Sequence, residues 1–379
     1  MMKHLIILVF SILLSSCSVN KLNPLGWMGS DKNATSSNEK KELVDHTDSA
    51  QKNLEITKPK ITSLDQLPKK EIKHTKAVRD YCRKIDKKFL HWGWGLSRCE
   101  DYNWHHVRNS YKGDPLIWTV FGDEAAHKKN KKDMTMIMCG VHGDEITPIK
   151  FCFDVIRHLE RIQAGIEPGQ EELKNKLIVV APIVSPDSFF IRRPTRTNAR
   201  GVDLNRNFPT KDWSKDALRL WKHRYSKDKR RFPGKKPLSE PETLFQVNLI
   251  KRYGPNKILS VHAPLTILDY DGPEELGVKI SHKATQLLLQ MSREAKGYRI
   301  KNYPFFPGSL GNYAGNERSI PTYTLELPSS DNRKHKVYWE RFKKAIHYAL
   351  LHDLRDEKEV NVALEKSHEE GEQTHQQAN

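Results

Sequence analysis

The stretch Met134–Glu145, with the sequence MTMIMCGVHGDE, decides the expected fold of this chain. Its first part, Met134 to Cys139, is an uninterrupted apolar run of the kind expected for a buried central strand. Gly140 ends the run, and His142 and Glu145 follow three residues apart. An imidazole and a carboxylate at this spacing can face one point in space. They would make half of a zinc site of two histidines and one glutamate, which needs a second histidine from a distant part of the chain.

Taken alone, the His-x-x-Glu spacing is weak evidence, because in a lysine-rich chain it is more often coincidence than a metal site. The position of this pair in the sequence strengthens the evidence for a metal site. Apolar residues at helical spacing follow directly, at Ile149, Phe153, Ile156 and Leu159. The two polar residues therefore lie between a strand and a helix, which is where α/β folds place their functional sites.

Further apolar runs predict more strands of the same sheet, among them Leu116–Phe121 and Leu177–Ala181. The run Lys257–His262 ends in a histidine. A lone histidine at a strand end is usually structural, but here it is the ligand type that the first stretch lacks. The run Thr322–Pro328 carries Glu326. Burying an unpaired carboxylate costs free energy, so we expect this residue to be paired or functional.

Strands that alternate with helices predict an α/β fold. We expect a single domain, residues 73–357, with a central mixed, mostly parallel twisted sheet flanked by helices on both faces. Ser239-Glu240-Pro241-Glu242 reads as a capping box that opens a helix to about Tyr253. Trp339–Leu354 is an amphipathic helix that closes the domain, and Lys128–Asp133 is a charged turn before the central strand.

The polar segment Arg196–Phe208 follows the strand at 177–181 and concentrates Arg196, Asn205 and Arg206. Guanidinium groups hold carboxylates with two parallel hydrogen bonds, which suits the free C-terminus of a peptide. The alternative is an ordinary polar surface loop with ion pairs.

The N-terminus has the pattern of an export signal over residues 1–16, with a basic start and an apolar run from Leu5 to Leu14. Leu14-Ser15-Ser16-Cys17 resembles the lipobox of bacterial lipoproteins, which implies that Cys17 is acylated. The alternative is an ordinary secretory signal with a chance cysteine. Either pattern predicts export, and the lipobox predicts a lipid-anchored, periplasm-facing protein of the bacterial cell envelope.

Polar segments flank the expected domain. Residues 17–72 carry the lipidated cysteine and read as a flexible tether, and residues 358–379 read as a disordered tail, because neither has enough apolar side chains to form a core. The formal net charge is +17. An exported basic protein usually meets an anionic partner, but no nucleic-acid-binding motif is present. A solvated basic surface and a wall-binding surface are equally good explanations of the charge.

The cysteines other than Cys17 number four, and an exported protein can form disulfides. Cys82 and Cys99 flank a short segment and could pair. Cys139 lies in the predicted central strand and Cys152 in the helix that follows. We expect those two to be buried free thiols.

A family resemblance now emerges from the ordered set of motifs. His142-x-x-Glu145, Asn205-Arg206, His262 and Glu326 resemble, in this order, the zinc metallocarboxypeptidases of the carboxypeptidase A type over most of residues 75–355. The segments GVDLNRNFP, SEPET, SVHAPL, PGSLGNYAG and TLELP are similar to the bacterial murein peptide amidase branch. That branch cuts the bond between γ-D-glutamate and meso-diaminopimelate in peptidoglycan stem peptides, and includes DL-carboxypeptidases.

The resemblance implies the chemistry of the site. His142, Glu145 and His262 would bind one zinc ion, which leaves a fourth position for water. Zinc would lower the pKa of that water. Glu326 would be the general base that activates it.

The resemblance also implies substrate contacts. Arg206 and Asn205 would clamp the terminal carboxylate of the peptide, Arg196 would stabilise the oxyanion, and Tyr303 would close over the substrate. The side-chain ammonium of diaminopimelate would need an acidic partner. Two candidates follow His262 in the sequence, Asp269 and Asp271.

Two departures from the branch limit this prediction. The basic stretch 210–238, which we expect to be a helix or long loop, is longer than the branch implies and could gate the site. Ala263 stands where a small polar residue would be unsurprising. The sequence also leaves room for three alternatives, which are an aspartoacylase-type deacylase, a zinc carboxypeptidase acting on ordinary peptides, and an inert wall-binding lipoprotein. The oligomeric state is left open.

Overall fold

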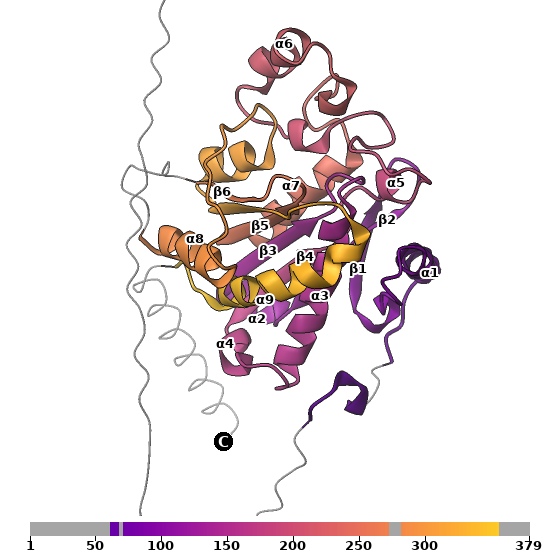
Figure 1. Ribbon diagram of the computed structural model, residues 1–379, viewed down its shortest axis with the longest axis vertical. Coiled ribbons are helices and arrows are strands. Elements are labelled where there is room, and N and C mark those ends of the chain that lie inside the picture. Colours follow the sequence, from indigo (N-terminus) through magenta and orange to yellow (C-terminus); the bar gives the residue numbers. More distant parts are fainter. Residues whose placement is uncertain (1–60, 68–70, 273–281, 356–379) are drawn as a thin grey trace, which may run out of the picture. The chain divides into compact units, whose positions relative to one another are not determined.

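The protein is described by a computed structural model that covers residues 61–67, 71–272 and 282–355 (Figure 1). The predicted signal, Cys17 and the tail 358–379 lie outside the described residues. Within the stretch predicted as a tether, the structure describes one 3₁₀ turn, Leu64–Gln66, which Ser63 and Gln66 close with a capping box. No helix in the described part of the chain is long and apolar enough to cross a bilayer.

A seven-stranded sheet organises the described residues, in the order β1-β2-β4-β3-β5-β7-β6. Strands β4, β3, β5 and β7 run parallel in the centre, and β1, β2 and β6 pair antiparallel at the two sides. The expected mixed sheet is therefore confirmed. The strands are β1 (Trp104–Asn109), β2 (Pro115–Phe121), β3 (Asp133–Cys139), β4 (Lys176–Ala181), β5 (Lys257–His262), β6 (Ile267–Asp271) and β7 (Thr322–Glu326).

The central strands are apolar along their whole length because both of their faces are covered. Every residue of β3, β4 and β5 is buried. Alternate side chains enter two separate cores, so Ile137 packs in one cluster and Met136 in the other. This arrangement explains why the sequence shows continuous apolar runs and not an alternating pattern.

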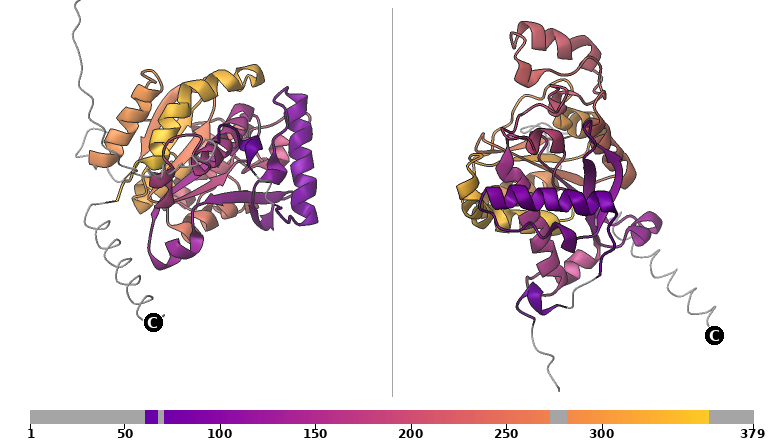
Figure 2. Two further views of the ribbon diagram at one scale, coloured as in Figure 1. Left: turned by 90° about the horizontal axis from the view of Figure 1, so that it is seen from below. Right: turned by 90° about the vertical axis from the view of Figure 1, so that its right-hand side faces the viewer.

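Helices cover both faces of the sheet, as expected (Figures 1 and 2). Residues of α1, α3, α8 and α9 pack into one cluster, and residues of α7 pack into the other. The helices are α1 (Lys76–His91), α2 (Glu124–Lys129), α3 (Ile146–Gln163), α4 (Gln170–Lys174), α5 (Pro186–Phe189), α6 (Leu218–His223), α7 (Pro241–Tyr253), α8 (His282–Glu294) and α9 (His335–Leu351).

Two local predictions differ from the structure at the ends of elements, and the closing helix itself is confirmed. The charged turn at 128–133 overlaps α2, which Asp123 caps by accepting from the backbone N–H groups of Ala125 and Ala126. The closing helix α9 begins at His335 and ends at Leu351, so its bounds differ from those predicted by a few residues. Both errors concern the ends of elements, where a short polar sequence fits a helix and a turn equally well.

The predicted capping box before α7 is also wrong. Glu240 is the N-cap and its side chain makes no capping hydrogen bond. The Oγ of Ser239 donates to Glu240 Oε1 at 2.6 Å, and Asn198 Nδ2 donates to Glu240 Oε2 at 2.8 Å and Glu242 Oε2 at 3.1 Å. The two carboxylates therefore anchor the loop that contains Arg196. Their hydrogen bonds to Asn198 take the place of the predicted local cap.

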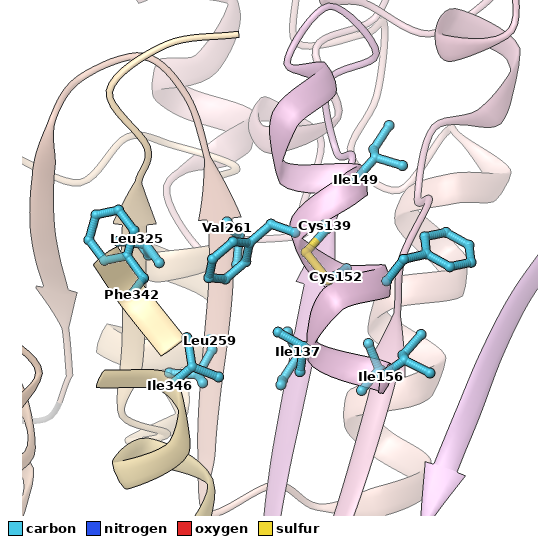
Figure 3. Packing of buried hydrophobic residues seen from close by; sticks show 14 of the residues in the cluster. Ile137, Cys139, Ile149, Cys152, Ile156, Leu259, Val261, Leu325, Phe342 and Ile346 are labelled. Carbon is cyan, nitrogen blue, oxygen red and sulfur yellow. A yellow bond between two sulfur atoms is a disulfide. The ribbon is translucent and has the colours of Figure 1, made fainter. Parts of the chain in front are cut away.

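The disulfides differ in part from the prediction. Cys82 and Cys99 are bonded, as the sequence allowed. Cys139 and Cys152 are bonded too, so the prediction of free thiols there is wrong (Figure 3). The reason is that α3 packs back onto the sheet directly after β3, which brings the two Cα atoms to 6.3 Å.

We expect the double variant Cys139→Ala/Cys152→Ala to lower the free energy of unfolding by about 2–4 kcal/mol, because the bond restricts the unfolded chain. The loop that it closes contains His142 and Glu145, so zinc affinity should fall as well. Urea unfolding followed by circular dichroism, together with zinc titration, measures both effects.

The matched control is Cys82→Ala/Cys99→Ala, because it opens a bond of similar sequence separation, 17 against 13 residues. This control variant should lower the free energy of unfolding by a comparable amount and leave the zinc affinity unchanged. Equal zinc affinities in the two double variants would contradict a special role for the bond after β3.

Candidate active site

Three predicted metal ligands meet where two neighbouring strands end. Strands β3 and β5 are parallel, and Cys139 at the end of β3 pairs with Val261 of β5. His142 and Glu145 follow β3, and His262 is the last residue of β5. One ligand atom from each of the three lies within 4.8 Å of the other two, and all three residues are buried.

The Glu145 carboxylate lies between the two imidazoles. Its Oε1 is 2.7 Å from His142 Nδ1, and its Oε2 is 2.9 Å from His262 Nδ1. The other ring nitrogen of His142, Nε2, lies 3.0 Å from Asp203 Oδ1. A carboxylate in this place fixes the ring and leaves Nδ1 free to bind a metal. Asp203 was missed by the sequence analysis, although it stands two residues before Asn205.

These residues fit a zinc ion. Two imidazole nitrogens and one carboxylate are a donor set that zinc prefers, and catalytic zinc sites have three protein ligands and an open position. The ligand atoms are already within reach of one point. A cavity of about 400 Å³ adjoins them, and His142, Glu145 and His262 line it, so there is room for water and substrate at the open position.

Glu326 lies across from His262 at the end of β7. The two residues are register partners in the parallel pair of β5 and β7. Glu326 lines the same cavity, and its Oε2 accepts a hydrogen bond from the backbone N–H of Leu265 at 3.3 Å. Burial is the main reason that the pKa of this carboxyl is raised above its usual value. The sequence placed Glu326 inside its strand, whereas the structure places it at the strand end, beside the metal ligands.

Arg196 lies beside the ligands as well. Its Nη1 is 3.1 Å from Glu145 Oε1, and its Nε is 3.1 Å from Asp203 Oδ2. The side chain is 20% exposed and lines the cavity. The guanidinium is therefore held by two carboxylates at the cavity wall, beside Glu145.

Asn205 and Arg206 occupy a single 3₁₀ turn, Leu204–Arg206, in the cavity wall. Asn205 Oδ1 accepts from the backbone N–H of Leu310 at 2.8 Å. The Arg206 guanidinium lies 4.2 Å from the ring centroid of Phe306, and its Nη1 donates to the Asn205 carbonyl at 2.6 Å.

Arg206 has no anionic partner among the residues that the structure describes. Within the described part of the chain its Nε is buried without a hydrogen-bond partner, and no carboxylate lies within ion-pair distance of it there. Burial is the main cause that lowers the pKa of this guanidinium. A buried N–H without a partner is costly, and this part of the cavity wall can accept an anion.

Tyr303 also lines the cavity. Its backbone N–H donates to Asp269 Oδ1 at 2.8 Å, and the Lys301 ammonium lies 4.6 Å from its ring centroid. The structure thus brings Tyr303 into the same cavity as Asp269 and Asp271 of β6. Its predicted closing movement stays a prediction.

The cavity includes residues that the sequence analysis missed. Among them are Ser260 and Thr324 from the strands, and Asp228, Arg230 and Arg231 from the basic stretch. The strand residues are recognisable only once the register is known, because Ser260 and Asp269 both pair with Thr324.

Residues 101–349 match the family described as zinc carboxypeptidase. The chain belongs to this family. It is therefore a peptidase, and its family is one that uses zinc.

Individual relatives agree with this assignment. The chain is 31% identical over 236 residues to murein peptide amidase A of Escherichia coli (strain K12), an alignment that covers 61% of this chain and 84% of that protein. The murein peptide amidase A of Vibrio campbellii is 30% identical over 195 residues, covering 51% and 68%. The crystal structure of carboxypeptidase A from Helicoverpa armigera superposes with a TM-score of 0.52 at 18% identity over 75% of each chain, which supports the fold.

Proposed function

We propose that this zinc carboxypeptidase hydrolyses peptidoglycan stem peptides at the bond between γ-D-glutamate and meso-diaminopimelate, with one zinc ion. The similarity to proteins named murein peptide amidase A supports the substrate class. The observation that carries the proposal is the cavity itself. Beside the predicted metal ligands it offers the Arg206 guanidinium and the carboxylates of Asp269 and Asp271, none of which has an ion-pair partner among the described residues.

The residues around the metal ligands suit hydrolysis of an amide bond. A zinc ion bound here would supply a water of lowered pKa and polarise the scissile carbonyl. In our proposal Glu326 accepts the proton of that water and passes it to the leaving amine. Arg196 donates hydrogen bonds to the oxygen on which negative charge develops. Arg206, with Asn205 beside it, holds the terminal carboxylate and so fixes the bond that is cut.

The sheet register gives the positions of the two aspartates. Ile267 of β6 pairs with Glu326, and Asp269 and Asp271 follow it on the same strand. Alternate residues of a strand face the same side and are about 7 Å apart. Measured along β6 from Ile267, the register partner of Glu326, Asp269 therefore lies about 7 Å away and Asp271 about 13 Å away. This is the part of the cavity into which the side chain of the terminal residue would extend.

Asp269 and Asp271 are suited to a cation. In the described residues neither of them has an ion-pair partner, and burial raises the pKa of Asp269 to about 6 and that of Asp271 to about 7. A Cβ atom at Gly311 would overlap the Asp271 carboxylate, so a glycine there leaves room for it. Unpaired carboxylates are costly to bury. The side-chain ammonium of diaminopimelate would form the ion pair that these carboxylates lack among the described residues.

The preference for this ammonium should depend on pH. The ammonium stays charged at neutral pH, whereas the two carboxyls ionise as the pH rises through about 6 to 7. We expect the ratio of kcat/KM for the diaminopimelate tripeptide to that for its 2-aminopimelate analogue, which lacks the side-chain amine, to rise about 10-fold or more from pH 5 to pH 8.

The variant Asp271→Asn should lower this ratio at pH 8 and flatten its pH dependence. Asn316→Ala serves as the control and should keep the wild-type pH profile, because Asn316 follows Gly315, which packs against Asp271, but does not line the cavity. A ratio that does not change with pH in the wild type would rule out the aspartates as the ammonium receptor.

The direct test uses the chain from Ser18 onward, purified with zinc. Incubation with L-Ala-γ-D-Glu-meso-diaminopimelate should release diaminopimelate. A parallel incubation with an α-linked L-peptide ending in lysine, which also carries a terminal ammonium, should give far less product. Faster release of lysine would identify an ordinary carboxypeptidase, and no release from either peptide with zinc bound would contradict the proposed activity.

We also propose that the enzyme acts in the bacterial cell envelope, anchored to a membrane through lipid on Cys17. The sequence Leu14-Ser15-Ser16-Cys17 supports this. Mass spectrometry of the mature protein from membranes should show an acylated N-terminal Cys17. Cys17→Ser should move the protein to the soluble fraction, and an unmodified wild-type cysteine would contradict the proposal.

A further inference from the structure

The second half of the basic stretch 210–238 lines the cavity of the candidate active site. Its helix α6 stands out from the domain (Figure 2). The segment after α6 runs back to the cavity, which it lines with Asp228, Arg230 and Arg231. The wall of the site therefore contains two arginines that none of the metal, base or carboxylate-clamp roles uses.

The arginines lie on a well-anchored turn, Lys229–Arg231. Before it, the indole of Trp221 donates to the carbonyl of Asp228 at 2.8 Å. After it, the carbonyl of Phe232 accepts from the backbone N–H of Asp203 at 2.8 Å. Asp203 also contacts the metal ligand His142. The turn is thus fixed to the framework of the metal site.

Arg230 and Arg231 face the substrate position. Arg230 Nη1 lies 2.9 Å from an oxygen of Asp144, the residue just before the metal ligand Glu145. The Arg231 guanidinium stacks over Tyr225 at 4.7 Å, and the Tyr225 ring lies 6.3 Å from that of Phe306, which also lines the cavity. Both cations therefore border the cavity, and Arg230 does so beside the residue that precedes Glu145.

We propose that Arg230 and Arg231 form an anion subsite for the free α-carboxylate of the γ-linked glutamyl residue, on the acyl side of the scissile bond. This inference rests on the proposed function. In a γ-linked glutamyl residue the side-chain carboxyl forms the peptide bond, so the α-carboxylate remains free and negatively charged. A peptide built of neutral residues offers no anion there.

Exposure indicates which half of the substrate these arginines meet. The Asp269 end of the cavity is closed, since Asp269 is 8% exposed and Ser260 2%. The Arg230 and Arg231 side chains are 61% and 43% exposed. A stem peptide continues from its glutamyl residue toward alanine and the glycan strand, so this half must leave through the open part of the cavity, whose exposed lining includes the two arginines together with Leu265 and Phe305.

The guanidinium groups can accept a further anion. Their present partners are Asp144 at 2.9 Å and Asp228 at 3.4 Å, whose side chains are 24% and 41% exposed. Such solvent-screened pairs are weak. Each guanidinium has five N–H donors in a fork that matches a carboxylate, so a substrate anion can bind beside or in place of these partners.

The test compares two tripeptides that differ in one group. One is L-Ala-γ-D-Glu-meso-diaminopimelate, and the other carries the α-carboxamide, D-isoglutamine, in place of the glutamate. With the full-length protein in detergent, we expect wild-type kcat/KM to be about 10- to 100-fold higher for the free carboxylate. Arg231→Ala should bring this ratio close to 1.

The control is Lys215→Ala/Lys222→Ala, which removes two exposed cations from the same stretch but away from the cavity. It should keep the wild-type ratio. Calorimetry with the products L-Ala-γ-D-Glu and L-Ala-γ-D-isoglutamine measures the same preference without turnover, and zinc content checks that each variant is loaded.

The outcomes separate the two proposals. Equal wild-type rates on both tripeptides would overturn the anion subsite and leave the proposed function standing. A ratio that is unchanged in Arg231→Ala would also overturn the subsite. If neither tripeptide is cleaved, the proposed function fails, and equal binding of the two dipeptides would then reject the subsite as well.

Discussion

Glu326→Gln should keep its zinc and lose about 10³-fold in kcat on the stem tripeptide, the range expected for a general base. Glutamine has nearly the same shape, and its amide oxygen can still accept from the backbone N–H of Leu265, which contacts Glu326 at 3.3 Å. It cannot take a proton from water. Turnover measured by release of diaminopimelate, with zinc measured by atomic absorption, separates the two effects.

Glu145→Gln is the matched control, because the same chemical change is made at a residue that lies between His142 Nδ1 and His262 Nδ1. It should lose zinc together with activity. Loss of zinc from Glu326→Gln would show that Glu326 is a ligand, and full activity in that variant would remove it from the mechanism.

The part of the site that could be predicted from sequence is the part that follows strand ends. His142 and His262 stand at or just beyond the end of an apolar run, and parallel neighbours end at one edge of a sheet. The end of each run therefore predicts the position of these two residues, whereas Glu326 was placed inside its run and reaches the same edge because β7 ends there. This reasoning needs no knowledge of which strands are neighbours, since any order of parallel strands puts these ends on the same edge.

Features that depend on tertiary approach could not be predicted in this way. The bond between Cys139 and Cys152 requires the packing angle of α3 on the sheet. The carboxylate of Asp203 reaches His142 across 61 residues of sequence. In each case the local sequence is compatible with other partners, and the packed structure selects one.

The capping box that did not form shows that a local sequence pattern can be present without the predicted contact. Glu242 has the residue type and spacing of a local cap, but its carboxylate accepts from Asn198, 44 residues away. The local pattern was present, but the Glu242 carboxylate bonds to a residue from a distant part of the chain. The arginines of the basic stretch are a related case, since nothing in their spacing indicates that Arg230 would reach Asp144.

Arg206→Ala should lower kcat/KM about 100-fold on peptides with a free terminal carboxylate, because a hydrogen-bonded charge pair in a buried site contributes about 2–5 kcal/mol. The basis for this magnitude is that the buried Nε of Arg206 has no hydrogen-bond partner, and the guanidinium no ion-pair partner, among the described residues. The measurement compares the stem tripeptide with the same peptide carrying a terminal carboxamide. The variant should lose little on the carboxamide, which the wild type already binds poorly.

Arg206→Lys distinguishes charge from geometry. Lysine keeps a cation but lacks the planar fork that binds both carboxylate oxygens and stacks on an aromatic ring, as Arg206 does over Phe306 at 4.2 Å. We expect it to restore only part of the activity on the free carboxylate. Equal losses on carboxylate and carboxamide substrates in both variants would mean that Arg206 supports the cavity wall, and the terminal carboxylate would then have to bind to another cation of the cavity, such as Arg196.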